Sequence, residues 1–170
     1  LSEFLRVNPG AKDARLALAR ILIAEKRYDE SRTHFDRLLK DFPDNPEIIY
    51  PVAMLALQAN DPVTGKAQLE KLLTGDFKDK ATVHFFLGQI EEEAKNLDSA
   101  LAHYQQVSAG EQYVPARARA AQILAGKGRL DEARQLVRDT VGRTPAEKIQ
   151  LVLAEAHLLR ESKRIDDAFA

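Results

Sequence analysis

The stretch that decides the fold is Lys26-Arg27-Tyr28-Asp29-Glu30-Ser31, because close copies of it return along the chain. The copies are Lys95-Asn96-Leu97-Asp98-Ser99-Ala100, Gly128-Arg129-Leu130-Asp131-Glu132-Ala133 and Lys163-Arg164-Ile165-Asp166-Asp167-Ala168. Each consists of two mostly polar residues, an apolar residue, Asp, an acidic residue or Ser, and a small residue. This order predicts a tight turn, then an apolar side chain that packs between the helices, then the N-terminus of a helix. The acidic residues there meet the positive end of the helix dipole.

The spacing of the copies predicts a tandem repeat. Their last residues, Ser31, Ala100, Ala133 and Ala168, are separated by 69, 33 and 35 positions, and Gly65 divides the first interval into 34 and 35. On both sides of each turn, apolar residues recur at i, i+3, i+4 and i+7, the spacing of an amphipathic helix. Pro9 and Pro43 each follow such a stretch, where proline ends a helix. The sequence therefore predicts helical hairpins repeated about every 34 residues.

The composition limits the class of protein. The chain has 170 residues, 45% of them apolar and 6% aromatic, which is typical of a soluble, ordered helical protein. Its formal net charge of −1 argues against a nucleic-acid partner, and no apolar stretch is long enough for membrane insertion. The absence of cysteine excludes a disulfide framework and is compatible with the cytoplasm or the periplasm, so the compartment stays unknown. The Ala- and Arg-rich composition suggests a bacterial origin.

Small and bulky residues recur at matching positions of the repeat. The small ones are Ala19, Ala53, Gly88 and Ala121 in the first helices, and Ser31, Gly65, Ala100 and Ala133 in the second helices. Bulky residues follow four positions after the second set, at Phe35, Leu69, Tyr104 and Val137. This pattern resembles the tetratricopeptide repeat (TPR) family over essentially the whole chain. The resemblance implies an all-α, right-handed α-solenoid (superhelix) of antiparallel helix-turn-helix hairpins, with small residues where two helices touch.

The same alignment predicts how one array, residues 1–170, is divided. Whole repeats are expected at about 12–45, 46–80, 81–113 and 114–146. Residues 1–11 match the end of a preceding repeat, and residues 147–170 supply an incomplete final repeat, with a first helix and the beginning of a second. Both ends look cut from a longer protein. The chain departs from the family at Pro51, which predicts that the first helix of the second repeat starts late or bends there.

The resemblance also implies a partner-binding groove. In the family, the first helices line a concave surface that takes an extended or helical peptide. The matching positions here are Leu16, Arg20, Ile23, Tyr50, Met54, Leu57, Phe85, Gln89 and Gln122. The apolar members predict anchors for a partner's side chains, since aromatic residues and Met are favoured at such surfaces. The alternative is that several simply pack on neighbouring helices, an interpretation that applies most to Leu57 and Phe85. The Lys and Asn set that clamps a C-terminal carboxylate in one subgroup is absent.

The charged and polar residues give no indication of an enzyme. The four histidines lie far apart in the sequence with no second ligand at i+4, and the glycines form no phosphate-binding loop, so neither a metal nor a cofactor is expected. Charge is uneven, however: residues 81–112 sum to −4 and residues 113–145 to +4. Either neighbouring repeats attract each other across their junction, or a dipolar surface orients a charged partner.

Together these features predict a non-catalytic scaffold that binds a protein or peptide partner. Two alternatives remain. The repeats would serve for self-association into a homo-oligomer, or they would capture substrate for an enzyme domain outside this segment.

Overall fold

The computed structural model of the protein describes residues 11–168 and the side chains of residues 11–160. All regular structure in this part of the chain is helical, which confirms the predicted all-α repeat fold. The described residues form two compact units, divided between Lys78 and Asp79, and each unit is described by itself. The end of a preceding repeat expected at residues 1–11 lies, apart from Ala11, outside the described residues.

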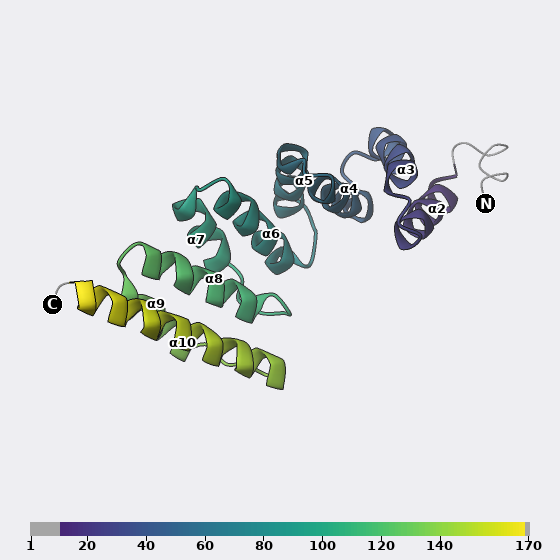
Figure 1. Ribbon diagram of the computed structural model, residues 1–170. Coiled ribbons are helices and arrows are strands. Elements are labelled where there is room, and N and C mark those ends of the chain that lie inside the picture. The colour runs from purple at the N-terminus through teal and green to yellow at the C-terminus, as the bar shows by residue number, and fades with distance from the viewer. Residues whose placement is uncertain (1–10, 169–170) are drawn as a thin grey trace. The chain divides into compact units, whose positions relative to one another are not determined.

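The first unit consists of two helical hairpins (Figure 1). Helices α2 (Lys12–Ala24) and α3 (Tyr28–Asp41) form one, and α4 (Pro46–Gln58) and α5 (Pro62–Thr74) form the other. Helix α3 also packs on α4, so the two hairpins share a core. Its buried members are Leu16, Ala19, Phe35, Leu38, Ile48, Val52 and Leu55.

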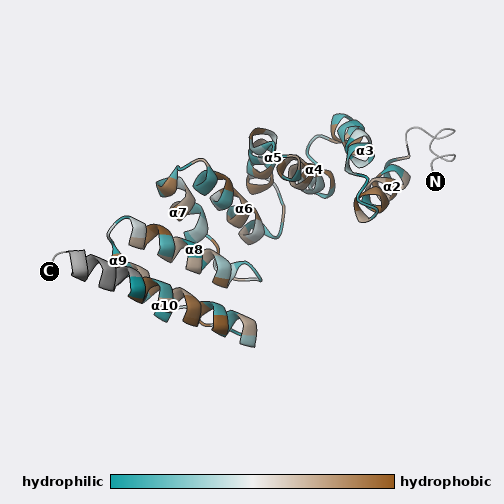
Figure 2. Cartoon of the chain, in the orientation of Figure 1, coloured by the Kyte–Doolittle hydropathy of each residue, from teal (hydrophilic) through white to brown (hydrophobic). Residues whose placement is uncertain are grey.

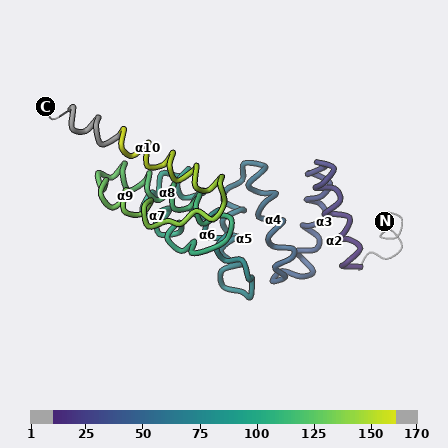
Figure 3. Tube along the Cα trace, turned by 90° about the horizontal axis from the view of Figure 1, so that it is seen from below, coloured from purple at the N-terminus to yellow at the C-terminus, as the bar shows by residue number. Residues whose placement is uncertain are grey.

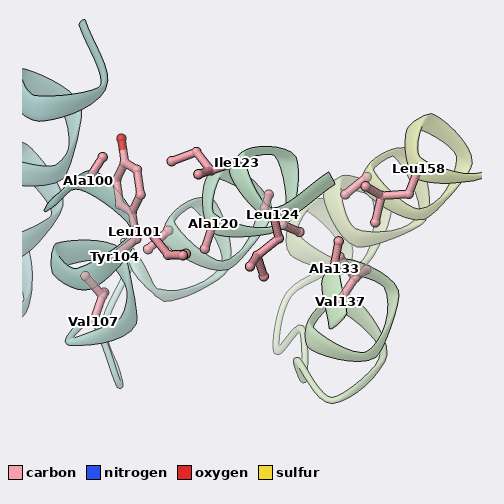
Figure 4. Close-up of a cluster of buried hydrophobic side chains, with 14 of the residues drawn as sticks. Ala100, Leu101, Tyr104, Val107, Ala120, Ile123, Leu124, Ala133, Val137 and Leu158 are labelled. Carbon is pink, nitrogen blue, oxygen red and sulfur yellow. The ribbon is translucent and has the colours of Figure 1, made fainter. Parts of the chain in front are cut away.

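The second unit adds two hairpins and a long final helix. The hairpins are α6 (Lys80–Glu93) with α7 (Leu97–Gln105), and α8 (Tyr113–Gly126) with α9 (Leu130–Arg138). Helix α10 (Pro145–Ala168) lies alongside α8 and α9 (Figure 3). The core runs from Tyr104 through Leu124 to Leu158 and is filled out by alanines (Figure 4). Small side chains let the helix backbones approach closely.

The turn inside each hairpin has the same geometry, as the recurring sequence stretch predicts. Lys26, Asn60, Lys95 and Gly128 adopt positive φ angles of 60°, 58°, 64° and 76°. In each turn the following N–H reaches five residues back, as from Arg27 to the carbonyl oxygen of Leu22 at 2.8 Å. This pairing closes the end of the first helix as in a Schellman motif. Acidic residues then occupy the first turn of α3, α7 and α9, where the helix dipole favours them.

Two local expectations about helix limits are corrected. Helix α4 does not start late: it begins at Pro46, where the Asn45 side chain accepts a hydrogen bond from the Glu47 N–H at 2.9 Å, and it continues through Pro51. A turn and a new helix were expected near Lys163, but α10 is one continuous helix to Ala168. Residues 146–168 contain neither glycine nor proline, so nothing local interrupts the helix. The repeat boundaries themselves stay a prediction.

Candidate partner-binding site

A hollow of about 460 Å³ opens on the surface of the first unit. Helix α2 contributes Arg20, the first two turns of α4 contribute most of the wall, and the segment after α5 closes it. The lining residues are Arg20, Pro46, Glu47, Tyr50, Pro51, Asp76, Phe77 and Lys78. The hollow is large enough for one or two side chains of a bound peptide.

The floor of the hollow is a pair of aromatic rings. Tyr50 and Phe77 stack with their ring centroids 5.5 Å apart and an angle of 20° between the ring planes. Tyr50 lies one helical turn after Pro46, so both face the same side of α4. Pro51 follows Tyr50 directly. The side chains of Tyr50, Phe77 and the two prolines are apolar over most of their surface. The hollow therefore offers a hydrophobic floor to a ligand.

Charges of both signs surround this floor. Arg20 and Lys78 carry positive charge, and Glu47 and Asp76 carry negative charge. The guanidinium Nη2 of Arg20 lies 4.0 Å from Oε2 of Glu47, and both side chains are more than half exposed. An ion pair of this kind contributes little to stability, so it can be exchanged for contacts with a ligand.

The structure brings two of the nine predicted groove residues, Arg20 and Tyr50, to this hollow. Leu16 and Phe85 are buried in the cores of the first and second unit, with 5% and 7% exposure, so their burial favours the packing interpretation. Ile23, Met54, Leu57 and Gln89 are half-buried, and Gln122 is exposed. The side chain of Leu57 leans on Gly65 inside its own hairpin.

Phe77 is the contributor that the repeat pattern missed. It lies in the connecting segment after α5, outside any helix, so helical periodicity carries no information about it. The signal that points to it is an aromatic residue within the otherwise polar stretch Gly75-Asp76-Phe77-Lys78-Asp79-Lys80. The equivalent connection after α3 holds Phe42, which is 36% exposed and has the Lys12 ammonium 5.3 Å above its ring.

A second, smaller hollow of about 210 Å³ lies where α3 meets α4 and the start of α5. Its basic residue, Arg32, donates a hydrogen bond to the carbonyl oxygen of Leu55 at 3.1 Å, near the C-terminus of α4. Asp61 accepts from the Thr64 N–H at 3.0 Å and caps α5. These polar groups are therefore already bonded to backbone groups at the ends of α4 and α5. This hollow is the weaker candidate for a partner-binding site.

The opposite charges of the third and fourth repeats meet directly. Glu92 accepts hydrogen bonds from the Tyr104 hydroxyl at 2.6 Å and from Arg119 Nη1 at 3.0 Å, and the Lys127 ammonium pairs with Asp98. Burial and the neighbouring Glu92 carboxylate raise the pKa of Tyr104, so its hydroxyl stays a donor. These contacts show the attraction across the junction that the charge sums predicted as one of two interpretations.

The fold brings two histidines together that the sequence separates. His84 on α6 and His103 on α7 approach with their Nδ1 atoms 3.1 Å apart. Within the described residues, however, no three groups among His, Cys, Asp and Glu are placed to hold a metal ion. In the same residues, no helix is both long enough and apolar enough to cross a membrane.

Comparison with known proteins places the fold in context. TPR repeat-containing protein PA4667 of Pseudomonas aeruginosa is 37% identical over 86 residues, which are 51% of this chain and 15% of the length of that relative. Among solved structures, YrrB, described as a TPR protein with an unusual peptide-binding site, matches with a TM-score of 0.70 and 18% identity, over 92% of this chain and 82% of its own. MamA matches with a TM-score of 0.70 and 16% identity, over 89% of this chain and 88% of its own.

Two family models cover nearly all of the sequence. Both describe the tetratricopeptide repeat; one matches residues 1–55 and 91–158, and the other matches residues 52–114. Taken with the hairpins, the recurring turn and the small residues at the helix contacts, these matches show that the chain belongs to the tetratricopeptide repeat family.

Proposed function

We propose that this chain is a protein-interaction scaffold whose first unit binds a peptide segment of a partner in the hollow around Tyr50 and Phe77. The observation that carries the proposal is the stacked aromatic floor of an open hollow of about 460 Å³. A structurally similar TPR protein, YrrB, has a peptide-binding site, which supports the same class of function here.

The chemistry of the hollow favours a large apolar side chain as the anchor of the bound peptide. Such a side chain covers the rings of Tyr50 and Phe77 and removes apolar surface from water, the main source of affinity in peptide recognition. Arg20 and Lys78 on the rim are placed to meet acidic or carbonyl groups beside the anchor, and Glu47 and Asp76 to meet basic groups or amide donors. The rim therefore orients the peptide, and the floor holds it.

The test uses a displayed library of random peptides, because such a library samples many sequences and does not depend on which partner the protein has in the cell. Binders selected on the wild-type chain are measured again on Phe77→Ala and on Phe42→Ala. The two variants form a matched pair, since both remove a Phe from the equivalent connection of the first unit, and only Phe77 lines the hollow. We expect Phe77→Ala to weaken binding at least thirtyfold, about 2 kcal/mol, as for a central anchor residue.

Tyr50→Ala with Met54→Ala should likewise abolish binding while the helical circular dichroism spectrum stays unchanged. Equal affinity of the selected peptides for wild type, Phe77→Ala and the Tyr50/Met54 variant would contradict the proposal. A loss in Phe42→Ala that matches the loss in Phe77→Ala would place the peptide elsewhere on the unit.

Self-association is a second candidate function, because apolar residues recur along α10 (Figure 2) and only some of them are buried. Ala154 and Leu158 are buried in the core of the second unit. Ile149, Val152 and Leu153 lie on the other side and are 61%, 67% and 64% exposed. A helix that is apolar on both sides is typical of one covered on both sides.

Sedimentation velocity tests this second candidate. If a second copy covers the face, the wild-type chain dimerises as its concentration rises, and Val152→Glu with Leu153→Glu returns it to a monomer. A wild-type chain that stays monomeric throughout excludes this role for α10. Capture of substrate for an attached enzyme domain remains a further prediction, which the sequence of the whole protein would test.

A further inference from the structure

Two hairpins carry a polar pair at the same place between their helices. In the α2–α3 hairpin, Arg15 Nη1 lies 3.4 Å from Nδ1 of His34. In the α6–α7 hairpin, Nδ1 of His84 lies 3.1 Å from Nδ1 of His103. The partners are 19 residues apart in both hairpins, and the pairs are two repeats apart in the sequence. The pairs therefore occupy one repeat position in two copies.

The pair in the α2–α3 hairpin requires His34 to be neutral. A guanidinium group can only donate hydrogen bonds, so Nδ1 of His34 must accept with its lone pair. Nε2 then carries the hydrogen of the neutral ring. A proton taken up by His34 has only Nδ1 left to bind, so it removes the acceptor and points a second N–H at the charged Arg15.

The pair in the α6–α7 hairpin tolerates one added proton but not two. The ring centroids of His84 and His103 lie 5.4 Å apart and their Nδ1 atoms 3.1 Å apart, so the rings point these nitrogens at one another. One Nδ1 must hold the hydrogen between them and the other must accept it. The donor ring can still take up a proton at its Nε2. Protonation of the acceptor ring breaks the bond and brings two cations together.

The surroundings of both pairs oppose the charged forms. Burial and then Arg15 lower the pKa of His34, while Glu30 on its own helix acts weakly in the opposite direction. Helix α4, which also packs on α3, supplies apolar Ile48, Val52 and Leu55 to this core. Arg32 of α3 reaches toward α4 and bonds to a carbonyl oxygen there.

Burial likewise lowers the pKa of His84, followed by the effects of His103 and of Lys80 at the start of α6. Helix α8 packs on α7 with Ala116 and Ala120 in the shared core, and its Arg119 is engaged with Glu92 of α6. No carboxylate is among the groups that act on His84 in this part of the structure.

We propose that these two pairs form an acid-sensitive device, in which protonation loosens the α2–α3 and α6–α7 hairpins and leaves the other two intact. The α4–α5 hairpin has Ile49 and Gln68 at the equivalent positions, and the α8–α9 hairpin has Arg117 and Leu136. Neither of these hairpins has a histidine there, so they serve as controls within the same molecule. Since α2 also carries Arg20, loosening of the first hairpin disturbs one wall of the hollow described above.

The direction of the pH effect follows from the lowered pKa of each histidine. Above the ordinary pKa of about 6.5, histidine is neutral in both the folded and the unfolded hairpin. Its protonation therefore takes nothing from the stability of the hairpin in that range. As the pH falls below 6.5, the histidine becomes protonated in the unfolded chain but stays neutral in the folded hairpin. The free energy of unfolding of the hairpin therefore decreases with falling pH until the lowered pKa is reached. The loss should therefore begin below about pH 6.5 in both hairpins.

Hydrogen exchange measured by mass spectrometry between pH 7.5 and pH 5 tests the device, after correction for the intrinsic pH dependence of exchange. We expect protection in α2–α3 and α6–α7 to fall by up to tenfold per pH unit in this window, while α4–α5 and α8–α9 change little. His34→Gln should remove the effect from α2–α3 alone, and His84→Gln from α6–α7 alone. An equal loss in all four hairpins, or an unchanged loss in these variants, would overturn the proposal.

A titration of the wild-type histidine side chains by NMR keeps the test independent of whether the variants fold. His34 and His84 should titrate below pH 6.5, and the loosening of each hairpin should follow the titration of its own histidine. Titration of both histidines at or above 6.5 would refute the device. Because neither readout depends on a bound peptide, failure of the proposed peptide site would leave this result unaffected.

Discussion

Gly88→Ala tests a very close contact between two helices of the second unit. Gly88 lies in α6 and faces the ring of Tyr104 on α7, which is completely buried. A β-carbon built on Gly88 would lie 2.6 Å from Cε1, 2.7 Å from Cδ1 and 3.0 Å from Cζ of Tyr104. These distances are well inside van der Waals contact, so either the ring or α6 must move.

The ring has little freedom to move. Its hydroxyl donates a hydrogen bond to Glu92 at 2.6 Å, and its body packs beside Ala100 in the core (Figure 4). Overpacking of this kind costs about 1–3 kcal/mol. Losing the hydrogen bond to the carboxylate adds about 1.5–3 kcal/mol, and replacing a helical glycine by alanine recovers about 1 kcal/mol. We expect a net destabilisation of the second unit of about 1.5–5 kcal/mol.

Gly126→Ala is the matched control, because Gly126 also lies in a helix of the second unit, and an added β-carbon there would meet no atom within 4 Å beyond the adjoining backbone of its own helix. It should leave stability unchanged or raise it by about 0.4–1 kcal/mol. Urea unfolding followed by circular dichroism compares the two variants, and hydrogen exchange in α6 and α7 localises the loss. Both substitutions replace a helical glycine by alanine. If one lowers and the other raises the free energy of unfolding, the difference is due to the contact with Tyr104.

Tyr104→Leu provides a second check through a double-mutant cycle. Leucine is flexible and has no ring at this position, so Gly88→Ala should cost at least 1 kcal/mol less in the Tyr104→Leu background. Equal stability of Gly88→Ala and Gly126→Ala, or simple additivity with Tyr104→Leu, would refute the assignment of Gly88 and Tyr104 as contacting positions of the repeat.

Three further substitutions test the packing and the ion pairs. Ala100 is completely buried, so Ala100→Leu should lower the melting temperature by several degrees, and a change within about one degree would show that the alignment of the third repeat is wrong. Ser31→Ala removes a buried hydrogen bond to the carbonyl oxygen of Ala19 at 2.8 Å and should cost about 0.5–1.5 kcal/mol in urea unfolding; no loss would mean that the hydroxyl is dispensable. Asp98→Asn breaks the pair with Lys127, but Asp98 is 89% exposed, so unfolding should change by less than about 1 kcal/mol, and a larger effect would contradict the view of this pair as a surface contact.

The sequence by itself determined the hairpins, because their information is local and repeated. A tight turn, an acidic first helical turn and small residues one repeat apart are each indicated by the sequence, whereas the positive φ angles of the turns come from the structure. Positions such as Gly88 and Ala100 follow from this period, since close helix packing allows only small residues there. The sequence also predicted Arg20 and Tyr50 as residues of a partner-binding groove; both line the hollow, and their part in binding stays a prediction.

Only the tertiary structure decided which of these residues act together. Phe77 joins Tyr50 from a connecting segment that has no periodicity, and Leu16 and Phe85 turn inward although the family pattern places them on the groove. His84 and His103 meet because antiparallel helices bring positions 19 residues apart to the same level. The periodic pattern specifies the face of a helix, whereas the packing of the neighbouring elements determines how much of that face stays open to a partner.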